Sequence, residues 1–457
     1  MRKVAVSIVG LISLLSAQRI KGVFGLLEGN GSSYPNTGLY YRWEDENNAS
    51  IMAYAGDLPG VEPFGNDLVY DPRSKLLFVV GGGPPLFTWN GSVHALDVWH
   101  SLVPLPTALT NIGARRLGVR DTLLLVTRDR APYFTAYRIN YDPQSGSLTL
   151  DSLWSPTHPL LRNLPDALLI WGDTAFIAIT YNPTNFSADS LVLAINLQTR
   201  QVVGSWVVYP NPSELVRIKN NLYAACYGDF SSELRIARIT PSVPTPQIQS
   251  AGYVSYGGFT TDTSGAKDTI LFWAAVDGSL RAFDVNTGLT TSSPYLGLAS
   301  SGAPFNPYAV LWVGNQIHMS FTNYIDTSLI VLRDPTYEPA PPHLDTLFVA
   351  GGFGGLGYPS LRRFIYVEDD TTRGLSTYLP AKPDFGGIQY DIRSGLLHWN
   401  PQVEIASAWV WDATGRLLRR ESRPQSAIPL EDLPAGVYVF TAVTLDGQTL
   451  SHRFLKP

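Results

Sequence analysis

An apolar strand pattern recurs along most of this chain at intervals of about 46 to 53 residues, and a period of that length restricts the fold strongly. A second apolar segment follows each copy after a short loop, and residues 22–30 and 37–45 form a similar pair upstream. The pattern therefore predicts paired strands throughout the chain. The recurring copies begin at Lys75, Thr122, Thr174, Asn221, Thr269 and Gln316.

A further apolar segment precedes most copies, as at residues 66–72 and 166–173, so one repeat holds about four strands. A single four-stranded sheet cannot bury both of its faces, whereas sheets packed radially in a ring can. The repeats predict an all-β fold in which residues 20–380 form a seven-bladed β-propeller. Residues 346–378 are expected to complete the last blade or to close the ring, and their length leaves an eight-bladed ring as the alternative.

The composition agrees with a fold of strands and tight turns. Charged residues make up only 16% of the chain and aromatic residues 12%, with 40 glycines and 34 prolines. The net charge of −5 is spread without long runs, which gives no basis for binding nucleic acid. Cys226 is the only cysteine, so no intramolecular disulfide can form and the core must provide the stability.

No motif identifies a cofactor, a metal site or a catalytic nucleophile, and we expect no cofactor. Gly352, Gly354 and Gly357 have the spacing of a dinucleotide-binding loop, but Pro359 follows at once and the next segment has the pattern of a strand. The seven histidines are scattered without metal-ligand spacing, and His318 is expected to be a packed or hydrogen-bonded residue of a strand. No G-x-S-x-G sequence occurs.

In a propeller, loops at the strand ends surround the two mouths of the central channel, so polar residues at equivalent strand ends are the candidate ligand-binding residues. The alternative is that these Asn and Asp residues only terminate strands by turning the backbone. The candidates are Asn66, Asp67, Asn111, Arg128, Asp129, Tyr181, Tyr227, Asp229, Asp277 and Asn323.

The N-terminus has the pattern of an export signal. Arg2 and Lys3 precede about a dozen apolar residues and a small-residue end at Ser16 and Ala17, as in a secretory signal peptide. The apolar run is shorter than the roughly 20 residues that span a membrane. We therefore predict a signal peptide at residues 1–17 and no transmembrane segment after its removal, with a buried first strand as the alternative.

Residues 385–457 form a second pattern of short strands and turns. An apolar strand is followed by Gly415, a second strand begins with Gly436 and Tyr438, a turn falls at Gly447, and Lys456 lies near the end. This region resembles the C-terminal sorting domain of the type IX secretion system of Bacteroidetes-type bacteria. The resemblance implies a small Ig-like β-sandwich in which those five residues belong to the recognised fold. It also implies the type IX secretion machinery as a partner and a final location outside the cell or on its outer surface, reached through the periplasm.

The opening segment at residues 25–43 and the Asp71-Pro72 turn resemble secreted seven-bladed propellers of the YncE-like and surface-layer type. Together, these features favour a non-enzymatic, exported propeller that binds a protein, glycan or small molecule at one mouth. The alternative is an exported hydrolase or lyase with its site in the central channel. Carboxylate, His and Arg side chains converging there would favour the enzyme, whereas a channel lined by Asn, Thr and apolar groups would favour binding.

A short string of Asp, then Ser or Thr, then an apolar residue or Thr recurs in the chain, as at residues 121–123, 173–175 and 268–270. It resembles the acceptor motif for O-glycosylation of exported Bacteroidetes proteins. A turn followed by a β-branched strand opener would produce the same string without any sugar. Both interpretations remain open at the level of sequence.

Overall fold

The computed structural model consists of β-strands and turns, and no helix occurs within the ranges it describes. No helix in those ranges is long and apolar enough to cross a membrane. The predicted signal peptide and the glycine-rich segment at 351–358 lie outside the described residues. The described residues are 19–29, 36–44, 51–82, 90–98, 104–143, 145–182, 185, 187–228, 234–252, 259–261, 269–275, 279–294, 306–313, 316–322, 328–333, 344–349, 360–370, 389–391, 396–399, 404–412, 417–430, 432–434, 436–445 and 449–456.

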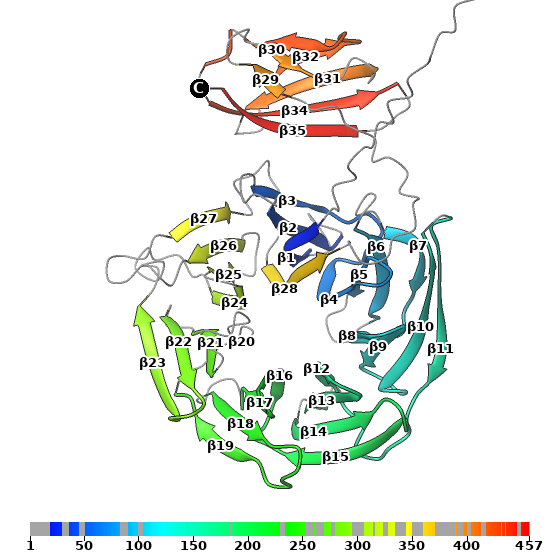
Figure 1. Cartoon of the computed structure of the whole chain (residues 1–457), viewed down its shortest axis with the longest axis vertical. Coiled ribbons are helices and arrows are strands. Elements are labelled where there is room, and N and C mark those ends of the chain that lie inside the picture. The colour runs from blue at the N-terminus through cyan, green and yellow to red at the C-terminus, as the bar shows by residue number, and fades with distance from the viewer. Residues whose placement is uncertain are drawn as a thin grey trace, which may run out of the picture.

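Most strands form four-stranded antiparallel sheets arranged around an axis, as Figure 1 shows. Within the described ranges, six of these sheets are each built from four strands that follow one another in the sequence. Their strands are β4 (Phe64–Asp71), β5 (Leu76–Gly82), β6 (Ser92–Asp97) and β7 (Pro104–Leu109); β8 (Ala114–Arg120), β9 (Leu123–Arg128), β10 (Phe134–Asp142) and β11 (Ser147–Trp154); β12 (Pro165–Trp171), β13 (Thr174–Tyr181), β14 (Ala188–Asn196) and β15 (Gln201–Val207); β16 (Pro212–Ile218), β17 (Asn221–Cys226), β18 (Arg235–Ile239) and β19 (Gln247–Ser250); β20 (Thr260–Thr261), β21 (Ile270–Ala274), β22 (Ser279–Asp284) and β23 (Leu289–Pro294); and β24 (Asn306–Val313), β25 (Gln316–Thr322), β26 (Ser328–Arg333) and β27 (Leu344–Val349).

A further four-stranded sheet closes the ring by joining segments from its two ends. The strand β28 (Ser360–Asp370) pairs antiparallel with β1 (Arg19–Glu28), which is followed in the sheet by β2 (Gly38–Glu44) and β3 (Ile51–Asp57). The segment expected to finish the last blade or close the ring does both, because β27 completes the β24–β27 sheet and β28 completes the composite one. The prediction of an all-β propeller is confirmed.

The strands that recur in the sequence are the second strands of the sheets, and each is buried on both faces. In β5, Phe78 packs against Leu124 and Val126 of the next sheet, whereas Val79 packs with Phe24 of the composite sheet. Alternate side chains of one strand point to opposite faces, so one strand contributes to two inter-sheet cores. Burial on both faces explains why these strands appear in the sequence as continuous apolar runs rather than as alternating patterns.

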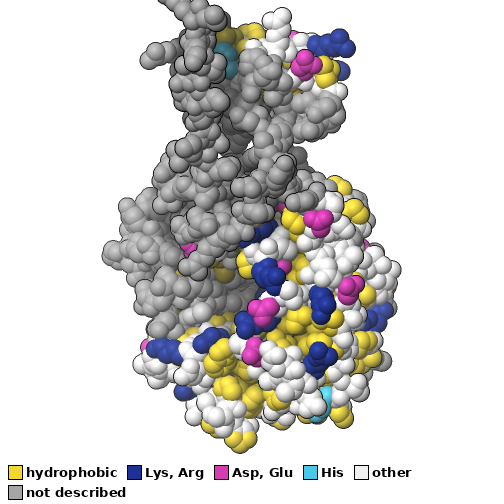
Figure 2. Space-filling view, turned by 45° about the vertical axis from the view of Figure 1, so that its right-hand side comes forward, with side chains coloured by type: hydrophobic (Ala, Val, Ile, Leu, Met, Phe, Trp, Pro, Cys, Tyr) yellow, Lys and Arg dark blue, Asp and Glu magenta, His cyan; other side chains and the backbone are white. Residues whose placement is uncertain are grey.

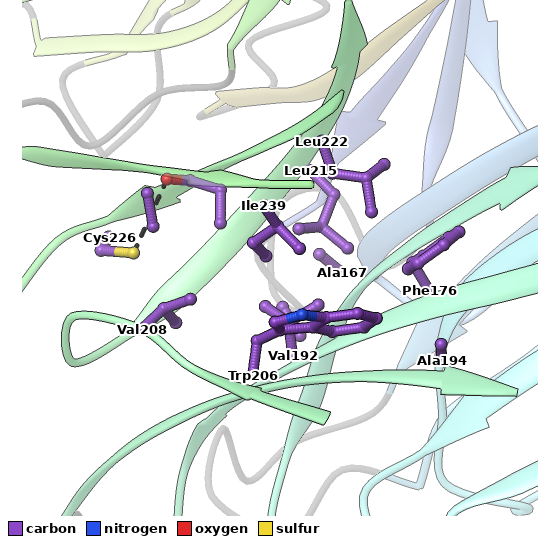
Figure 3. Close-up of a cluster of buried hydrophobic side chains, with 13 residues drawn as sticks. Ala167, Phe176, Val192, Ala194, Trp206, Val208, Leu215, Leu222, Cys226 and Ile239 are labelled. Carbon is purple, nitrogen blue, oxygen red and sulfur yellow. Dashed lines mark hydrogen bonds between the residues drawn. The ribbon is translucent and has the colours of Figure 1, made fainter. Parts of the chain in front are cut away.

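Cys226 belongs to one of these inter-sheet cores. It lies in a cluster with Phe176, Trp206 and Leu222 (Figure 3). Its Sγ is 3.6 Å from the Ala224 carbonyl oxygen. Burial raises the pKa of the thiol to about 12. The cysteine is therefore a small apolar core residue at neutral pH.

The recurring Asp-Thr strings at 121–122 and 173–174 are turns that join innermost strands to second strands. Asp121 has a φ of 53° in the β8–β9 turn, and Gly172 has a φ of 58° beside Asp173 in the β12–β13 turn. Short polar residues and glycine adopt positive φ most readily. Both strings therefore lie in tight turns that open a second strand.

The C-terminal strands form two further sheets beside the ring (Figure 1). Tyr438 and Phe440 of the larger sheet and Leu397 of the smaller one share a single apolar cluster. The strands expected in this region are present, with bounds close to the apolar runs. They are β29 (Gln389–Asp391), β30 (Leu396–His398) and β33 (Ala427–Pro429) in one sheet, and β31 (Ile405–Asp412), β32 (Leu417–Ser422), β34 (Gly436–Thr444) and β35 (Thr449–Lys456) in the other.

Candidate functional site

Among the described residues, six of the innermost strands have a β-bulge close to their starting ends. In β4, Gly65 and Asp67 face consecutive residues of β5, so Asn66 is the extra residue. The same irregularity occurs at Asp166 in β12 and at Ser213 in β16. The strands β8, β24 and β28 are bulged at the corresponding place. We call this end of the ring axis, where β4, β8, β12, β16, β24 and β28 begin, the bulge mouth.

A bulge re-aims the side chains next to it, and here it brings charged residues together at the axis. We call this group the axial cluster. It contains three arginines and three carboxylates, so its formal charges balance. Figure 2 shows basic and acidic side chains interspersed with hydrophobic ones on the face that it presents. The members of the axial cluster are Asp67, Arg115, Arg116, Asp166, Glu214 and Arg363.

Four members of the axial cluster form a closed cycle of ion pairs. Arg116 lies 4.0 Å from Asp67 and 3.6 Å from Glu214. Arg363 lies 2.7 Å from Asp67 and 3.8 Å from Glu214. Because Glu214 is on β16 and Arg363 is on β28, at opposite sides of the ring in Figure 1, the cycle spans the axis.

Asp166 extends the cycle on the side of β12. Arg115 donates a 2.9 Å hydrogen bond to its carboxylate, and the Nε of Arg116 donates a 2.5 Å hydrogen bond to its backbone carbonyl. Arg116 also donates to the carbonyl of Asn66. The guanidinium of Arg116 is thus fixed by groups from both neighbouring strands, which orients its donors before any ligand is present.

The axial cluster has a buried part and an exposed part. The side chains of Asp67 and Arg116 are 1% and 3% exposed, whereas those of Glu214 and Arg363 are 22% and 30% exposed. A molecule that enters the bulge mouth can therefore contact Glu214 and Arg363 directly. Among the carboxylates of the axial cluster, such a molecule can reach Glu214, whereas Asp67 and Asp166 are buried.

Hydrogen bonds from neighbouring sheets hold the innermost strands in place around the axial cluster. Asp67 accepts a 2.7 Å hydrogen bond from the backbone N–H of Leu117, and Asn66 donates to the Arg115 carbonyl. Thr127 and Thr180, on the second strands β9 and β13, donate to carbonyls at the start of the next innermost strand. These contacts are buried, so each contributes to the spacing of the sheets.

The ten sequence candidates fall into three groups, and the first is formed by Asn66 and Asp67. Both lie at the axis, where Asp67 is a member of the axial cluster and Asn66 supports it. They also link β4 to β8. The geometry is therefore consistent with both interpretations of Asn66 and Asp67, as ligand-binding residues and as residues that hold the strand ends in place.

The second group holds the loops of the bulge mouth in shape. Asn111 has a φ of 55° and its N–H donates to the Ser92 hydroxyl. The Nε of Arg128 donates to a backbone carbonyl at 2.6 Å. Asp129 donates its N–H to the Gly113 carbonyl, and Gly113 has a φ of 74° that favours glycine. These three positions lie at or next to strand ends, in the loops of the bulge mouth.

Tyr181 and Tyr227 complete the second group. The carbonyl of Tyr181 accepts a hydrogen bond from the N–H of Leu164, and Tyr227 is buried in the core between the β16–β19 and β20–β23 sheets. Asp229, Asp277 and Asn323 form the third group and lie outside the described residues. His318 is buried and packs near Phe364, as expected for a strand histidine.

Among the residues predicted for recognition of the C-terminal module, Gly436 begins β34 and Lys456 ends β35. Tyr438 is buried, and its hydroxyl donates to the Pro434 carbonyl. Gly415 and Gly447 lie outside the described residues.

A second charged contact lies away from the axis. The Nε2 of His94, on β6, is 2.7 Å from the Glu62 carboxylate, which lies in the connection before β4. Burial raises the pKa of Glu62, but hydrogen bonds from His94 and Ser92 outweigh this effect and the net shift is downward. In the part of the chain that the structure describes, no group of three or more His, Cys, Asp or Glu side chains is arranged to hold a metal ion.

Comparison with known proteins identifies no family for this chain. No protein-family model matches the sequence, and no curated protein matches it. Apo AztD from Citrobacter koseri is 13% identical with a TM-score of 0.44, over 77% of this chain and 99% of that chain. A Bacteroides fragilis protein proposed to be a 6-phosphogluconolactonase is 12% identical with a TM-score of 0.49, over 76% and 98% of the two chains. A chain of a nidogen/laminin complex is 10% identical with a TM-score of 0.40, over 75% and 97%. At such identities the likeness concerns the fold alone.

Five members of the axial cluster are not among the sequence candidates, namely Arg115, Arg116, Asp166, Glu214 and Arg363. A signal for them exists, because Arg116 lies 50 residues after Asn66 and 50 residues before Asp166, close to the period of the repeat. Aligning the segments that precede the recurring strands places Arg116, Asp166 and Glu214 at nearby positions of the repeat, whereas Arg363 lies on the ring-closing strand β28, which no recurring strand follows. The bulges that turn them toward the axis leave no comparable mark in the sequence.

Proposed function

We propose that this protein is an exported propeller that binds a polar ligand at the bulge mouth. The observation that supports it is the exposure of Glu214 and Arg363 at the axis, above a buried and oriented set of charges. Exposed charged groups placed on a rigid ring can select a ligand without rearrangement of the backbone. In this proposal the composite sheet of β28 and β1–β3 counts as the seventh blade.

We further propose that residues 385–457 are an Ig-like sorting domain recognised by the type IX secretion machinery. Support comes from the two sheets of this region, from their shared apolar cluster, and from the hydrogen bond between Tyr438 and Pro434. A buried tyrosine whose hydroxyl bonds back to a nearby upstream carbonyl is a feature of Ig-like sandwiches. With a signal peptide at residues 1–17, the protein would pass through the periplasm to the cell surface or the medium.

Truncation tests the export proposal. A chain ending at residue 384 should accumulate in the periplasm of a host with the type IX machinery, whereas the full chain should reach the surface or the medium. Fractionation followed by immunoblotting measures the distribution. Equal export of the two chains would refute the sorting role.

Binding at the bulge mouth is tested with two matched charge reversals. Glu214→Lys changes the bulge mouth, and Asp173→Lys changes an exposed acid at the opposite end of the ring, where it pairs with Arg120. The full chain and both variants are applied to arrays of glycans and peptides. We expect only Glu214→Lys to lose or change the bound set, and an equal effect of the two reversals would contradict the proposal.

A second candidate function is an exported hydrolase or lyase, and it is favoured by the convergence of carboxylates and arginines at the axis. Asp67 and Asp166 are nevertheless buried beneath arginines, which leaves Glu214 as the accessible carboxylate of the axial cluster. Acid–base chemistry by a pair of carboxylates requires both to reach the substrate. Turnover of an array ligand that Glu214→Gln abolishes, without loss of binding, would establish the enzyme instead of the binding protein.

A further inference from the structure

A carboxylate and two guanidinium groups meet at the axis in an arrangement suited to an external anion. The Glu214 carboxylate reaches from β16 to lie between Arg116 of β8 and Arg363 of β28. Its two oxygens each face a different guanidinium. A carboxylate between two guanidinium groups is a common mode of anion recognition, because the arginine donors match its two oxygens.

Glu214 is held less firmly than the other carboxylates of the axial cluster. Its N···O distances of 3.6 and 3.8 Å exceed the hydrogen-bond range of about 3.2 Å. Within the described part of the chain its carboxylate accepts no hydrogen bond. Asp67, by contrast, is 2.7 Å from Arg363 and also accepts the Leu117 N–H. Partial exposure allows the Glu214 side chain to turn into solvent.

The two arginines would keep their positions if Glu214 moved away. Arg116 donates to the backbone carbonyls of Asn66 and Asp166, and Arg363 pairs with Asp67. Removing the Glu214 charge from a balanced cluster leaves an excess of one positive charge. A single incoming carboxylate restores the balance, whereas a neutral or cationic group does not.

We propose that the space between Arg116 and Arg363 is a receptor site for the carboxylate group of a ligand, and that Glu214 occupies it until such a ligand arrives. The inference rests on the proposed binding function and specifies the ligand class for the same mouth. The ligand carboxylate takes the place of the Glu214 carboxylate, and the Glu214 side chain turns outward. Competition from Glu214 weakens binding in the wild type.

Chemical rescue tests this site. Glu214→Ala removes the CH₂–COO⁻ part of the side chain, which corresponds to acetate. The full-length variant is titrated with sodium acetate at pH 7, and its thermal unfolding midpoint is measured at each concentration. A reference titration uses sodium chloride at the same ionic strength in place of acetate. A ligand that binds the folded state raises the midpoint with a saturable dependence on concentration. We expect Glu214→Ala to bind acetate at least about tenfold more tightly than the wild type, which must first displace its own carboxylate.

The matched control is Asp173→Ala, which removes an exposed acid from an ion pair with Arg120 outside the axial cluster. It should show no saturable response to acetate. Equal responses of Glu214→Ala and Asp173→Ala would overturn the inference. If Glu214→Ala lacks the strand signal of the wild type in circular dichroism, the isosteric Glu214→Gln replaces it. That variant should respond more strongly than the wild type, and an equal response would also overturn the inference.

The outcome separates this inference from the proposed function. Binding of an uncharged glycan or peptide by the wild type, together with no acetate rescue of Glu214→Ala, would overturn the carboxylate site and leave the binding function standing. The opposite outcome is also informative. If acetate stabilises Glu214→Ala but no array ligand depends on Glu214, the result supports the carboxylate site and counts against the proposed binding function.

Discussion

The Nε atom of Arg363 lies 2.7 Å from Oδ1 of Asp67, and this ion pair links β28, the strand that closes the ring, to β4 of the neighbouring sheet. Asp67 is almost fully buried, and among the described residues the loss of Arg363 leaves its carboxylate with Arg116, at 4.0 Å, as the remaining cation. We expect Arg363→Met to lower the free energy of unfolding by about 1–3 kcal/mol. Urea denaturation at pH 7 measures this change in the free energy of unfolding.

A double-mutant cycle with Asp67→Asn isolates the pair. We expect the double variant to lose less than the sum of the single losses, because removing both charges leaves no buried ion without a partner. Arg120→Met is the control, since Arg120 and its partner Asp173 are exposed and such pairs contribute about 0–1 kcal/mol. Strict additivity of Arg363→Met and Asp67→Asn would show that the contact contributes nothing to ring closure.

The threonines on second strands should stabilise the contacts between sheets. Thr180 donates a 3.1 Å hydrogen bond to the Pro212 carbonyl, and Thr180→Val should cost about 1–2 kcal/mol by leaving that acceptor buried without its donor. Thr127→Val should cost more, because the Thr127 hydroxyl donates to the Pro165 carbonyl and also accepts a hydrogen bond from the backbone N–H of Arg116. Thr199 lies in an exposed turn, and Thr199→Val should stay within about 0.5 kcal/mol. Equal losses at Thr127 and Thr199 in chemical denaturation would contradict this account.

The fold could be predicted from the sequence because burial determines the pattern of the second strands. Residues such as Phe78 and Val79 face opposite inter-sheet cores, so both must be apolar and the run repeats with each blade. The axial cluster was harder to predict because a bulge decides where a polar residue points. The pattern marks Asp67 as a strand-end residue, whereas Glu214, in an equivalent strand, falls within an apolar segment.

The sequence also could not separate polar residues that shape a loop from those that face the axis. Asn111 and Asp67 both fall at the bulge mouth, but Asn111 turns the backbone with a positive φ and Asp67 joins the ion-pair cycle. The position of Tyr227 after a strand predicts a ligand-binding residue, yet its side chain packs in an inter-sheet core. The difference lies in side-chain direction, which depends on the twist and packing of sheets far apart in the sequence.

The contact between Glu62 and His94 should make stability sensitive to acid. The pKa of Glu62 is lowered on balance, since hydrogen bonds from His94 and Ser92 outweigh the opposing effect of burial. A carboxyl with a lowered pKa stabilises the fold above its ordinary value of 4.5, and this contribution disappears as the pH falls through the lowered value. The stability difference between the wild type and Glu62→Gln should therefore be largest near pH 6 and should shrink toward pH 3. Urea denaturation at both pH values tests this, and a difference that grows in acid would reverse the assigned direction.

Cys226 should be unreactive in the folded protein and should reduce stability at high pH. Its pKa of about 12 leaves roughly one thiolate in 10⁴ at pH 8, and the side chain is fully buried. The unfolded chain ionises this thiol at its ordinary pKa of about 8.5–9, so folding loses stability as the pH rises above 9. A disulfide reagent such as 5,5′-dithiobis(2-nitrobenzoic acid) should label the protein only in urea. Cys226→Ala should remove part of the stability loss between pH 8 and pH 10, and rapid labelling of the folded protein would contradict the assignment.

The hydrogen bond from the Tyr438 hydroxyl to the Pro434 carbonyl should stabilise the C-terminal module. The two residues are four apart, so the bond fixes the turn that enters β34, and Tyr438 also packs in the cluster that joins the two sheets. Tyr438→Phe removes the hydroxyl and keeps the ring, so it should cost about 1 kcal/mol. Hydrogen exchange of the β34 amides reports local stability in the full chain, and these amides should exchange roughly fivefold faster in the variant. Tyr366→Phe is the matched control, because the Tyr366 hydroxyl bonds to Glu368 at the surface. If Tyr366→Phe accelerated the β34 amides as much as Tyr438→Phe, the effect could not come from the turn at Pro434.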